Sequence, residues 1–343
     1  MFEFRHDAEE KLLVYGATAL IFLILSLPFD FMAFRAAGRE QVISIPESIA
    51  ILANNDYWPL AILQSLVILI LPATILLCVI FLVTCKKLAK KPKHADRVIN
   101  LLFKLLPWSM AEIFLIGVFV SLIKILSLAD ISLGLSFYTF MAFILFKTIM
   151  LLHLDKYQMQ QWFALHHEPG GSKVNIQHSV QSTWALLLTA VLLYIPANAW
   201  PIMQTSLLGQ TEPSTIIGGV ILLWKSGSIP IALIIFVFSV VIPTAKLLVL
   251  AWLNYTVQNN NLAQPAQKIR WYRITEFVGK WSMLDVFVVA ILVSLVQLGN
   301  TMAIYPGPAA LAFAGVVITT MLAAHSFEPR AIWIDNNKTS VIS

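Results

Sequence analysis

Eight apolar runs, each long enough to cross a bilayer, constrain this 343-residue chain more than any other feature. A membrane-spanning helix needs about 20 apolar residues, because its backbone polar groups must be satisfied without water. Hydrophobic residues make up 59% of the chain and charged residues 12%. We therefore expect an all-α polytopic membrane protein. The predicted spans are Leu12–Phe34, Leu60–Cys85, Met110–Leu128, Ile131–Leu152, Trp184–Met203, Pro230–Leu253, Met283–Met302 and Pro308–Ala324.

The distribution of basic residues predicts how these spans are oriented. With the N-terminus in the cytoplasm, 17 of the 23 Lys and Arg fall in cytoplasmic segments, three in outer loops and three inside spans. Cytoplasmic loops of membrane proteins carry such an excess. We therefore expect both termini in the cytoplasm. The basic residues sit in particular loops, so the net charge of +5 does not suggest a nucleic-acid partner.

Two outer loops of about 25 residues each carry signals for short helices. Arg35–Pro59 contains IPESIAIL, and Gln204–Ile229 contains EPSTIIGGVILLW. Ser48 and Ser214 are the predicted N-caps. These apolar stretches are too short to cross a bilayer, so we expect short interfacial or re-entrant helices.

The chain contains an internal repeat. The segment WSMAEIF at Trp108–Phe114 returns as WSMLDVF at Trp281–Phe287, and paired positions elsewhere keep an offset of 168 to 173 residues. Four spans per copy give both copies the same orientation, as in parallel-repeat transporters. The predicted organisation is a first transmembrane module over residues 1–160, a cytoplasmic linker over 161–181 and a second transmembrane module over 182–343.

An acidic residue recurs inside or at the edge of a span in both copies, as Glu112 and then Asp285. A charge at the bilayer centre costs about 3 kcal/mol on insertion scales, so it marks a pathway or relay by default. The polar residues that accompany this acid differ between the copies, because the second copy has Lys246 where the first has Ile75.

Helical spacing groups five polar residues of the second module. Ser239 and Lys246 are seven apart in the sixth span, Ser282 and Asp285 are three apart in the seventh, and Thr320 lies in the eighth. A buried lysine and a buried aspartate in adjacent spans are best accommodated facing each other. With neighbouring hydroxyls, such a pair can carry a proton and couple its passage to a helix movement. A purely structural ion pair is the alternative, and the spacing leaves both open.

The first module offers a weaker candidate built on Glu112. This residue precedes Lys124 by 12 positions, more than three helical turns, and Lys124 is expected to reach toward the outer interface. A structural or vestigial role is therefore predicted. Lys147 in the fourth span is predicted to be packed or cavity-facing, with no assigned role. We expect the second copy alone to hold the working site.

No enzyme signature is evident. Cys78 and Cys85 are seven apart in one span, and the chain has no CxxC motif that would favour a zinc site. No nucleophile–base set, phosphate loop or metal-ligand spacing is found. We therefore expect a protein that is not an enzyme and that binds no metal or other cofactor.

The second half resembles the paraquat-inducible protein A family, which includes the lipophilic envelope-spanning tunnel A proteins. The first half is similar to the family's first module more loosely. The stretches that carry the resemblance are TWALLLTAVLLYIPANAWPIM (183–203), GQTEPSTIIGGVILLWKSGSIPIA (209–232), PTAKLLVL (243–250), YRITEFVGKWSMLDVFVVA (272–290), and YPGPAALAF with VVITTMLAAHSFEPR (within 305–330).

The resemblance implies an inner-membrane subunit of a Gram-negative intermembrane lipid transport system. Its partner would be an MCE-domain periplasmic tunnel protein, and its cargo phospholipid or a similar lipid. Similar proteins are thought to use the proton gradient through a network that matches Ser239, Lys246, Ser282, Asp285 and Thr320. The alternatives are a non-catalytic scaffold for an MCE partner and a stand-alone proton-coupled exporter. Family members commonly carry cytoplasmic zinc ribbons with paired CxxC motifs, so we expect this chain to be a ribbon-less form.

Overall fold

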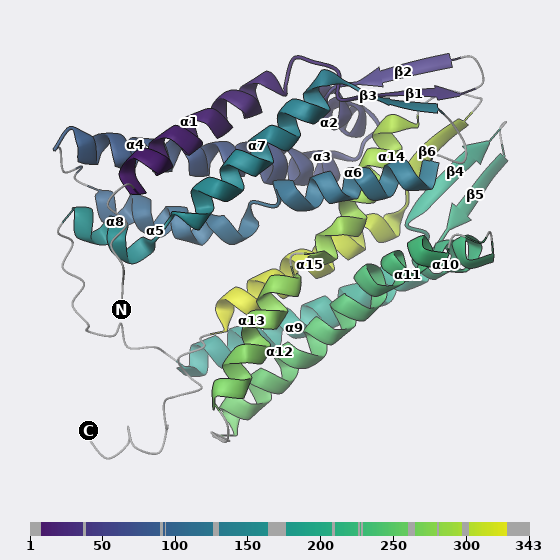
Figure 1. Ribbon diagram of the computed structural model, residues 1–343. Coiled ribbons are helices and arrows are strands. Elements are labelled where there is room, and N and C mark those ends of the chain that lie inside the picture. Colours follow the sequence, from purple (N-terminus) through teal and green to yellow (C-terminus); the bar gives the residue numbers. More distant parts are fainter. Residues whose placement is uncertain are drawn as a thin grey trace. The chain divides into compact units, whose positions relative to one another are not determined.

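The computed structural model covers residues 1–343. It describes residues 8–36, 39–89, 92, 94–125, 130–163, 176–207, 210–225, 227, 229–259, 265–279, 281–296 and 302–327. Contacts divide the chain into two compact units (Figure 1). The first unit comprises Met1–Gly170 with Ala290–Leu298, and the second comprises Gly171–Val289 with Gly299–Ser343.

Apart from α8 at the end of the first series, the described elements follow the same order twice along the chain, which agrees with the repeat in the sequence (Figure 1). The first series is α1 (Ala8–Leu25), β1 (Met32–Ala36), β2 (Arg39–Ile43), α2 (Ile45–Asn54), α3 (Trp58–Ser65), η1 (Leu66–Ile70), α4 (Leu71–Lys87), α5 (Ala95–Leu105), η2 (Leu106–Trp108), α6 (Ala111–Ile125), β3 (Asp130–Leu133), α7 (Leu135–Leu152) and α8 (Lys156–Trp162). The second series is α9 (Ile176–Ala199), β4 (Met203–Leu207), β5 (Gln210–Ser214), α10 (Ile216–Lys225), α11 (Ile229–Phe236), η3 (Val237–Val241), α12 (Ile242–Gln258), α13 (Pro265–Gly279), η4 (Trp281–Met283), α14 (Leu284–Leu295), β6 (Met302–Pro306) and α15 (Pro308–Ser326).

Within the described residues, seven helical stretches are long and apolar enough to cross a membrane, which confirms a helical multi-pass chain. Each of the seven overlaps one predicted span. The remaining predicted span, Leu12–Phe34, corresponds to α1, whose 18 residues include Glu9, Glu10 and Lys11. These charges leave an apolar stretch of 14 residues, Leu12–Leu25, which is about 21 Å of helix and short for a bilayer core.

Small antiparallel sheets occupy the ends of several predicted spans. The strand orders are β2-β1-β3 and β5-β4-β6, so each sheet joins a hairpin to a strand from a distant loop. The predicted helical ends at Phe34, Met203 and Met302 are therefore wrong, because these residues lie in β1, β4 and β6. Strand pairing satisfies the backbone groups that the ends of the helices release.

The two predicted loop helices are present as α2 and α10, ten residues each, but their N-caps differ from the prediction. Ser44 caps α2 in a capping box with Glu47, while Ser48 lies inside the helix. In α10, Thr215 Oγ1 accepts a hydrogen bond from Gly218 N–H at 3.0 Å, and Ser214 ends β5. The helices start earlier or later than predicted because the capping hydroxyl must reach a free N–H in the first turn.

The core of the first unit is aromatic. Phe31 contacts Phe114, Phe137 and Phe140, with ring centroids 5.6 to 6.1 Å apart, and Phe140 also contacts Phe143 at 5.3 Å. These rings come from the loop before β1 and from helices α6 and α7. Such pairs add about 1 kcal/mol each beyond the area they bury.

Small residues contribute to helix packing in the second unit. Helix α15 packs along α9, and its buried face includes Ala309, Ala310, Ala323 and Ala324. A Cβ atom at Gly315 would lie 3.0 Å from a methyl of Leu193 on α9. Small residues let membrane helices approach closely, which replaces the hydrophobic driving force available in water.

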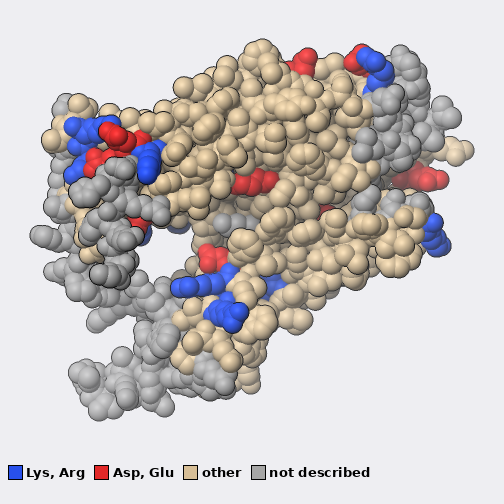
Figure 2. All heavy atoms as spheres, in the orientation of Figure 1, with Lys and Arg blue, Asp and Glu red and all other residues tan. Residues whose placement is uncertain are grey.

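The outer faces of the helices are apolar. Figure 2 shows a broad uncharged surface over α1 and α7, with charged side chains gathered toward the ends of the elements. Exposed hydrophobic side chains in the first unit include Ile21, Ile24, Leu77, Phe81 and Leu145, each at least 49% exposed. Such a surface suits contact with lipid chains.

Candidate functional site

Both copies of the repeated motif lie where a long helix is broken. In the first unit α5 passes through η2 and two non-helical residues before α6 begins at Ala111. In the second, η4 separates α13 from α14. Pro107 in η2 lacks a backbone N–H, which favours the break. Broken membrane helices expose backbone groups at membrane depth and often form transport sites.

The two acids occupy equivalent places after these breaks. Glu112 lies in the first turn of α6, and Asp285 lies in the first turn of α14. A carboxylate in a first helical turn is stabilised by the helix dipole, typically by about 0.3–1 kcal/mol. This local effect is reason enough for an acid at both positions, so the acid by itself does not define a functional site.

A second irregularity precedes Pro243 in the sixth predicted span. Residues Val237–Val241 form one turn of π-helix, in which the Ile242 N–H donates to the Val237 carbonyl five residues back. Pro243 has no N–H, and its ring would clash with the Ser239 carbonyl in a regular α-helix. The wider turn relieves that clash. The first unit contains an equivalent π turn, η1, before Pro72. Single π turns inside helices are frequent at functional sites.

The three predicted hydroxyls are buried, and each bonds to its own chain segment. Ser239 Oγ donates to Ile235 O at 2.6 Å, Ser282 Oγ to Gly279 O at 2.8 Å, and Thr320 Oγ1 to Val317 O at 2.9 Å. Their oxygen lone pairs remain able to accept a hydrogen bond. A hydroxyl network that crosses between helices stays a prediction.

Lys246 reaches the helix break from α12. Its side chain is 4% exposed, and its ammonium lies against the backbone of Gly279, the last residue of α13. A Cβ atom at Gly279 would lie 2.8 Å from Lys246 Nζ and 2.9 Å from its Cε. Glycine at this position therefore makes the space that the lysine occupies, and Ser282 bonds to the carbonyl of the same glycine.

The short η4 turn is the meeting point of the predicted polar set. It packs against η3, α12 and α15, the elements that carry Ser239, Lys246 and Thr320. Trp281 of η4 stacks on Phe238 of η3, with ring centroids 5.5 Å apart. Asp285 follows η4 and is 8% exposed. The direct pairing of Lys246 with Asp285 stays a prediction.

The spacing argument missed one polar contact next to the π turn. Tyr194 Oη lies 2.9 Å from Thr244 Oγ1, and Thr244 donates to the Val240 carbonyl at 2.7 Å. Both residues interrupt apolar runs, and Thr244 directly follows Pro243, which is the signal that the sequence offered. The contact joins α9 to α12 beside the backbone that the proline disturbs.

The first unit contains a polar cluster that the sequence did not predict. Lys147 on α7 is 1% exposed, and its Nζ lies 2.8 Å from Glu112 Oε1 and 2.9 Å from Ser109 Oγ. The Phe143 ring lies 5.9 Å from the same nitrogen. Glu112 itself is 36% exposed. The partner of Glu112 in this structure is therefore Lys147, whereas the side chain of Lys124 lies outside the described residues.

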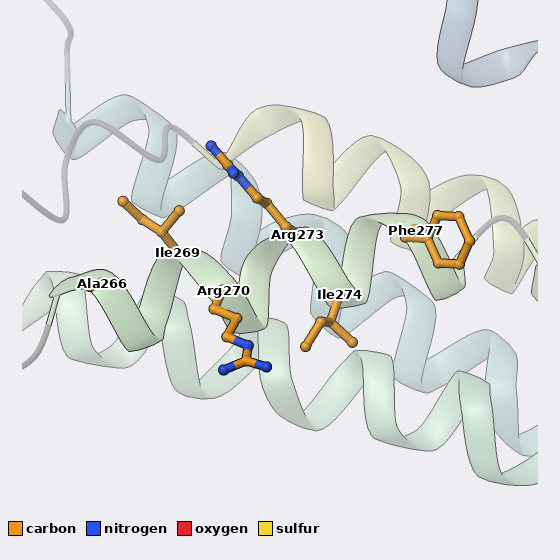
Figure 3. A pocket seen from close by; sticks show the side chains of 6 residues that line it. All are labelled: Ala266, Ile269, Arg270, Arg273, Ile274 and Phe277. Atoms are coloured by element: carbon orange, nitrogen blue, oxygen red, sulfur yellow. The ribbon is translucent and has the colours of Figure 1, made fainter. Parts of the chain in front are cut away.

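An open pocket of about 540 Å³ lies elsewhere, along α13. Figure 3 shows Arg270 and Arg273 pointing away from each other on this helix, with Ile269, Ile274 and Phe277 beside them. The pocket includes none of the five predicted site residues. Within the described part of the chain no group of three metal-ligating side chains is found, and the absence of a cofactor stays a prediction.

The family model of paraquat-inducible protein A matches residues 10–164 and 180–336 of the chain. The chain belongs to this family. It is 36% identical over 355 residues to the intermembrane transport protein PqiA of Escherichia coli K12, covering 93% of this chain and 85% of the relative. A probable intermembrane transport protein of Haemophilus influenzae is 26% identical over 350 residues, covering 92% and 83%.

The lipophilic envelope-spanning tunnel protein A of Escherichia coli K12 is 29% identical over 267 residues, covering 69% of this chain and 62% of the relative. No solved structure matches the chain. Family membership confirms the resemblance seen in the sequence, including its two tandem halves. The chain is thus a multi-pass membrane protein of the paraquat-inducible protein A family, whose relatives are named as transport proteins.

The boundaries predicted for the two modules and the linker stay a prediction. Much of the predicted linker, residues 164–175, lies outside the described residues.

Proposed function

We propose that this chain is the inner-membrane subunit of an MCE-type intermembrane lipid transport system. It would move phospholipid between the inner membrane and a periplasmic MCE-domain tunnel protein, with both of its termini in the cytoplasm. The names of its relatives support intermembrane transport. The excess of Lys and Arg in alternate loops supports the orientation.

The second unit would couple this transport to protons through Ser239, Lys246, Ser282, Asp285 and Thr320. The observation that carries the proposal is the burial of the Lys246 ammonium against Gly279, at a break in a membrane helix. A buried ammonium is costly unless it is paired or gives up its proton. A change in its protonation would therefore change the stability of the packing between α12, η4 and η3.

Two variants test the proton coupling directly. Replacing Lys246 with Ala or Asp285 with Asn should abolish lipid transfer from proteoliposomes to acceptor vesicles through the MCE partner. Protein level and copurification of the partner should stay at wild-type values. Full transfer in both variants would contradict the relay.

A scaffold function is the second candidate, because α10 presents a large exposed apolar face. Trp224 is 55% exposed, and Ile221 and Leu222 are 49% and 65% exposed. If the chain only docks the MCE partner, Trp224→Ala should release the partner while Lys246→Ala changes nothing. Transport in vesicles that contain no MCE protein would instead favour a stand-alone exporter.

A further inference from the structure

The first unit holds an ionisable cluster that resembles the proposed relay but is built from different positions. Ser109 and Glu112 repeat Ser282 and Asp285. The lysine, however, comes from α7, where the second unit has Thr319, and not from α4, where Ile75 stands. In the first unit, therefore, the lysine beside the duplicated motif comes from a different helix than in the second unit.

The neighbours of the two lysine positions differ in a matching way. In the second unit Lys246 fills the space beside Gly279. In the first unit the residue equivalent to Gly279 is Leu106, and the residue equivalent to Lys246 is Ile75. The glycine that leaves space for a lysine therefore occurs in the unit whose lysine comes from that position.

The first cluster is a hydrogen-bonded chain whose Glu112 end is more exposed than its Ser109 end. Ser109 is 8% exposed and Lys147 1%, whereas Glu112 is 36% exposed. The buried ammonium depends on Glu112, because one charge of a buried pair without the other is strongly destabilising.

We propose that Ser109, Lys147 and Glu112 form a second proton relay, in the first unit, which operates in the transport cycle proposed above and rests on that function. In the transfer step an N–H bond of Lys147 breaks and an O–H bond forms on Glu112 over 2.8 Å. The products are a neutral amine and a neutral carboxylic acid. Glu112 then gives its proton to water, which forms a hydronium ion. The amine takes the Ser109 hydroxyl proton while the serine oxygen takes a proton from another hydronium ion, so the net change is the movement of one proton.

Other ionisable groups lie on the elements packed against this cluster. Helix α1, which packs on α7, carries Glu9, Glu10 and Lys11 in its first turn. Its Tyr15 ring lies 6.4 Å from Phe146 and 6.0 Å from His153 of α7. Helix α7 also carries Tyr138, and η1, which packs on α6, has no ionisable residue.

Two variants separate a relay from a structural ion pair. Lys147→Arg keeps a positive charge beside Glu112, but a guanidinium does not give up its proton in proteins. The double variant Lys147→Met with Glu112→Gln removes both charges, a replacement that is often neutral for stability. A relay predicts that both variants lose lipid transfer by about tenfold or more while remaining folded and bound to the partner.

A structural ion pair predicts the opposite result, namely wild-type transfer in the double variant. A wild-type rate of lipid transfer in either variant, provided that the variant folds, overturns the inference. If one variant fails to fold, the other still tests the relay. The matched control is Gln64→Met with Ser48→Ala. It removes a buried 3.0 Å hydrogen bond between two residues of the same unit that carry no charge, and lipid transfer should be kept.

Lys246→Met in the same assay distinguishes this inference from the proposed function. If Lys246→Met stops transfer and the Lys147 variants do not, only the first-unit relay is wrong. If Lys246→Met transfers at the wild-type rate, the coupling proposed for the second unit is wrong, and the Lys147 variants still decide whether the first unit carries a relay.

Discussion

The two halves of the chain place a buried lysine near the same motif from different helices. In the second unit Lys246 comes from α12 and lies against Gly279. In the first unit Lys147 comes from α7 and bonds to Glu112 and Ser109. A position-by-position comparison of the copies finds Ile75 opposite Lys246 and concludes that the first copy has lost its cation. The structure shows that a duplicated unit can keep a charge near an acid while changing the helix that supplies it.

The halves also differ in how their helices pack, and this comparison yields the largest predicted effect. Phe140 is fully buried and contacts Phe31, Phe114 and Phe143. Phe140→Ala should destabilise the first unit by about 3–5 kcal/mol, because it removes a ring and leaves a cavity. Thermal unfolding of the purified protein measures the loss. The control is Leu311→Ala on α15, which is 40% exposed and should change stability little. Equal losses would contradict the aromatic core.

Breaking the first-unit ion pair from its two ends should give unequal losses. Glu112→Gln removes the carboxylate beside the buried Lys147 ammonium and should cost up to about 3 kcal/mol. Lys147→Met leaves only Glu112, which is 36% exposed and can be solvated, so its cost should be smaller. Denaturant unfolding of both variants measures the difference. Equal costs would mean that the ammonium does not depend on Glu112.

The space beside Lys246 can be closed without removing the lysine. Gly279→Ala would place a methyl group 2.8 Å from Lys246 Nζ, so the flexible end of the lysine must move. We expect a stability change within about 1 kcal/mol, because alanine also favours the helix, together with lipid transfer reduced several-fold. Gly219→Ala, which meets no atom within 4 Å, is the matched control and should keep transfer. Unchanged transfer in Gly279→Ala would mean that the position of the ammonium is unimportant.

A small loss of stability is expected at the contact that joins α9 to α12. Tyr194→Phe removes the 2.9 Å hydrogen bond to Thr244 and should cost about 1 kcal/mol. The equivalent first-unit residue is Ser26, which bonds within its own segment to Leu23 O at 2.7 Å. Ser26→Ala should therefore leave the contacts between helices unchanged. Thermal unfolding compares the two variants, and a larger loss in Ser26→Ala would reverse the assignment.

Several features of the fold follow from local sequence patterns. The apolar runs predicted the helices, because hydrophobicity over about 20 residues decides insertion. The repeat of WSMAEIF as WSMLDVF predicted two related halves, and the order of elements agrees. The short loop helices were also predictable, although their caps were not, because several hydroxyls near each start compete for the first free N–H.

The strands and the helix breaks were missed for a different reason. Strand β1 lies at the end of an apolar run and pairs with β3, about 100 residues later, so nothing local distinguishes it from a helix end. The π turns depend on where a carbonyl can move away from Pro72 or Pro243. Both features are set by backbone hydrogen bonding in three dimensions.

The sequence by itself determined a multi-pass helical chain of two tandem halves, with an acid at the same place in each and a lysine in the second. Composition and periodicity suffice for this, since lipid leaves few ways to satisfy a backbone. Only the tertiary structure decided which cation meets which acid. Lys147 and Glu112 are 35 residues apart on different helices, and no spacing rule within one helix joins them. Their 2.8 Å contact exists because the packing of α6 against α7 brings a buried ammonium to the one carboxylate that begins α6.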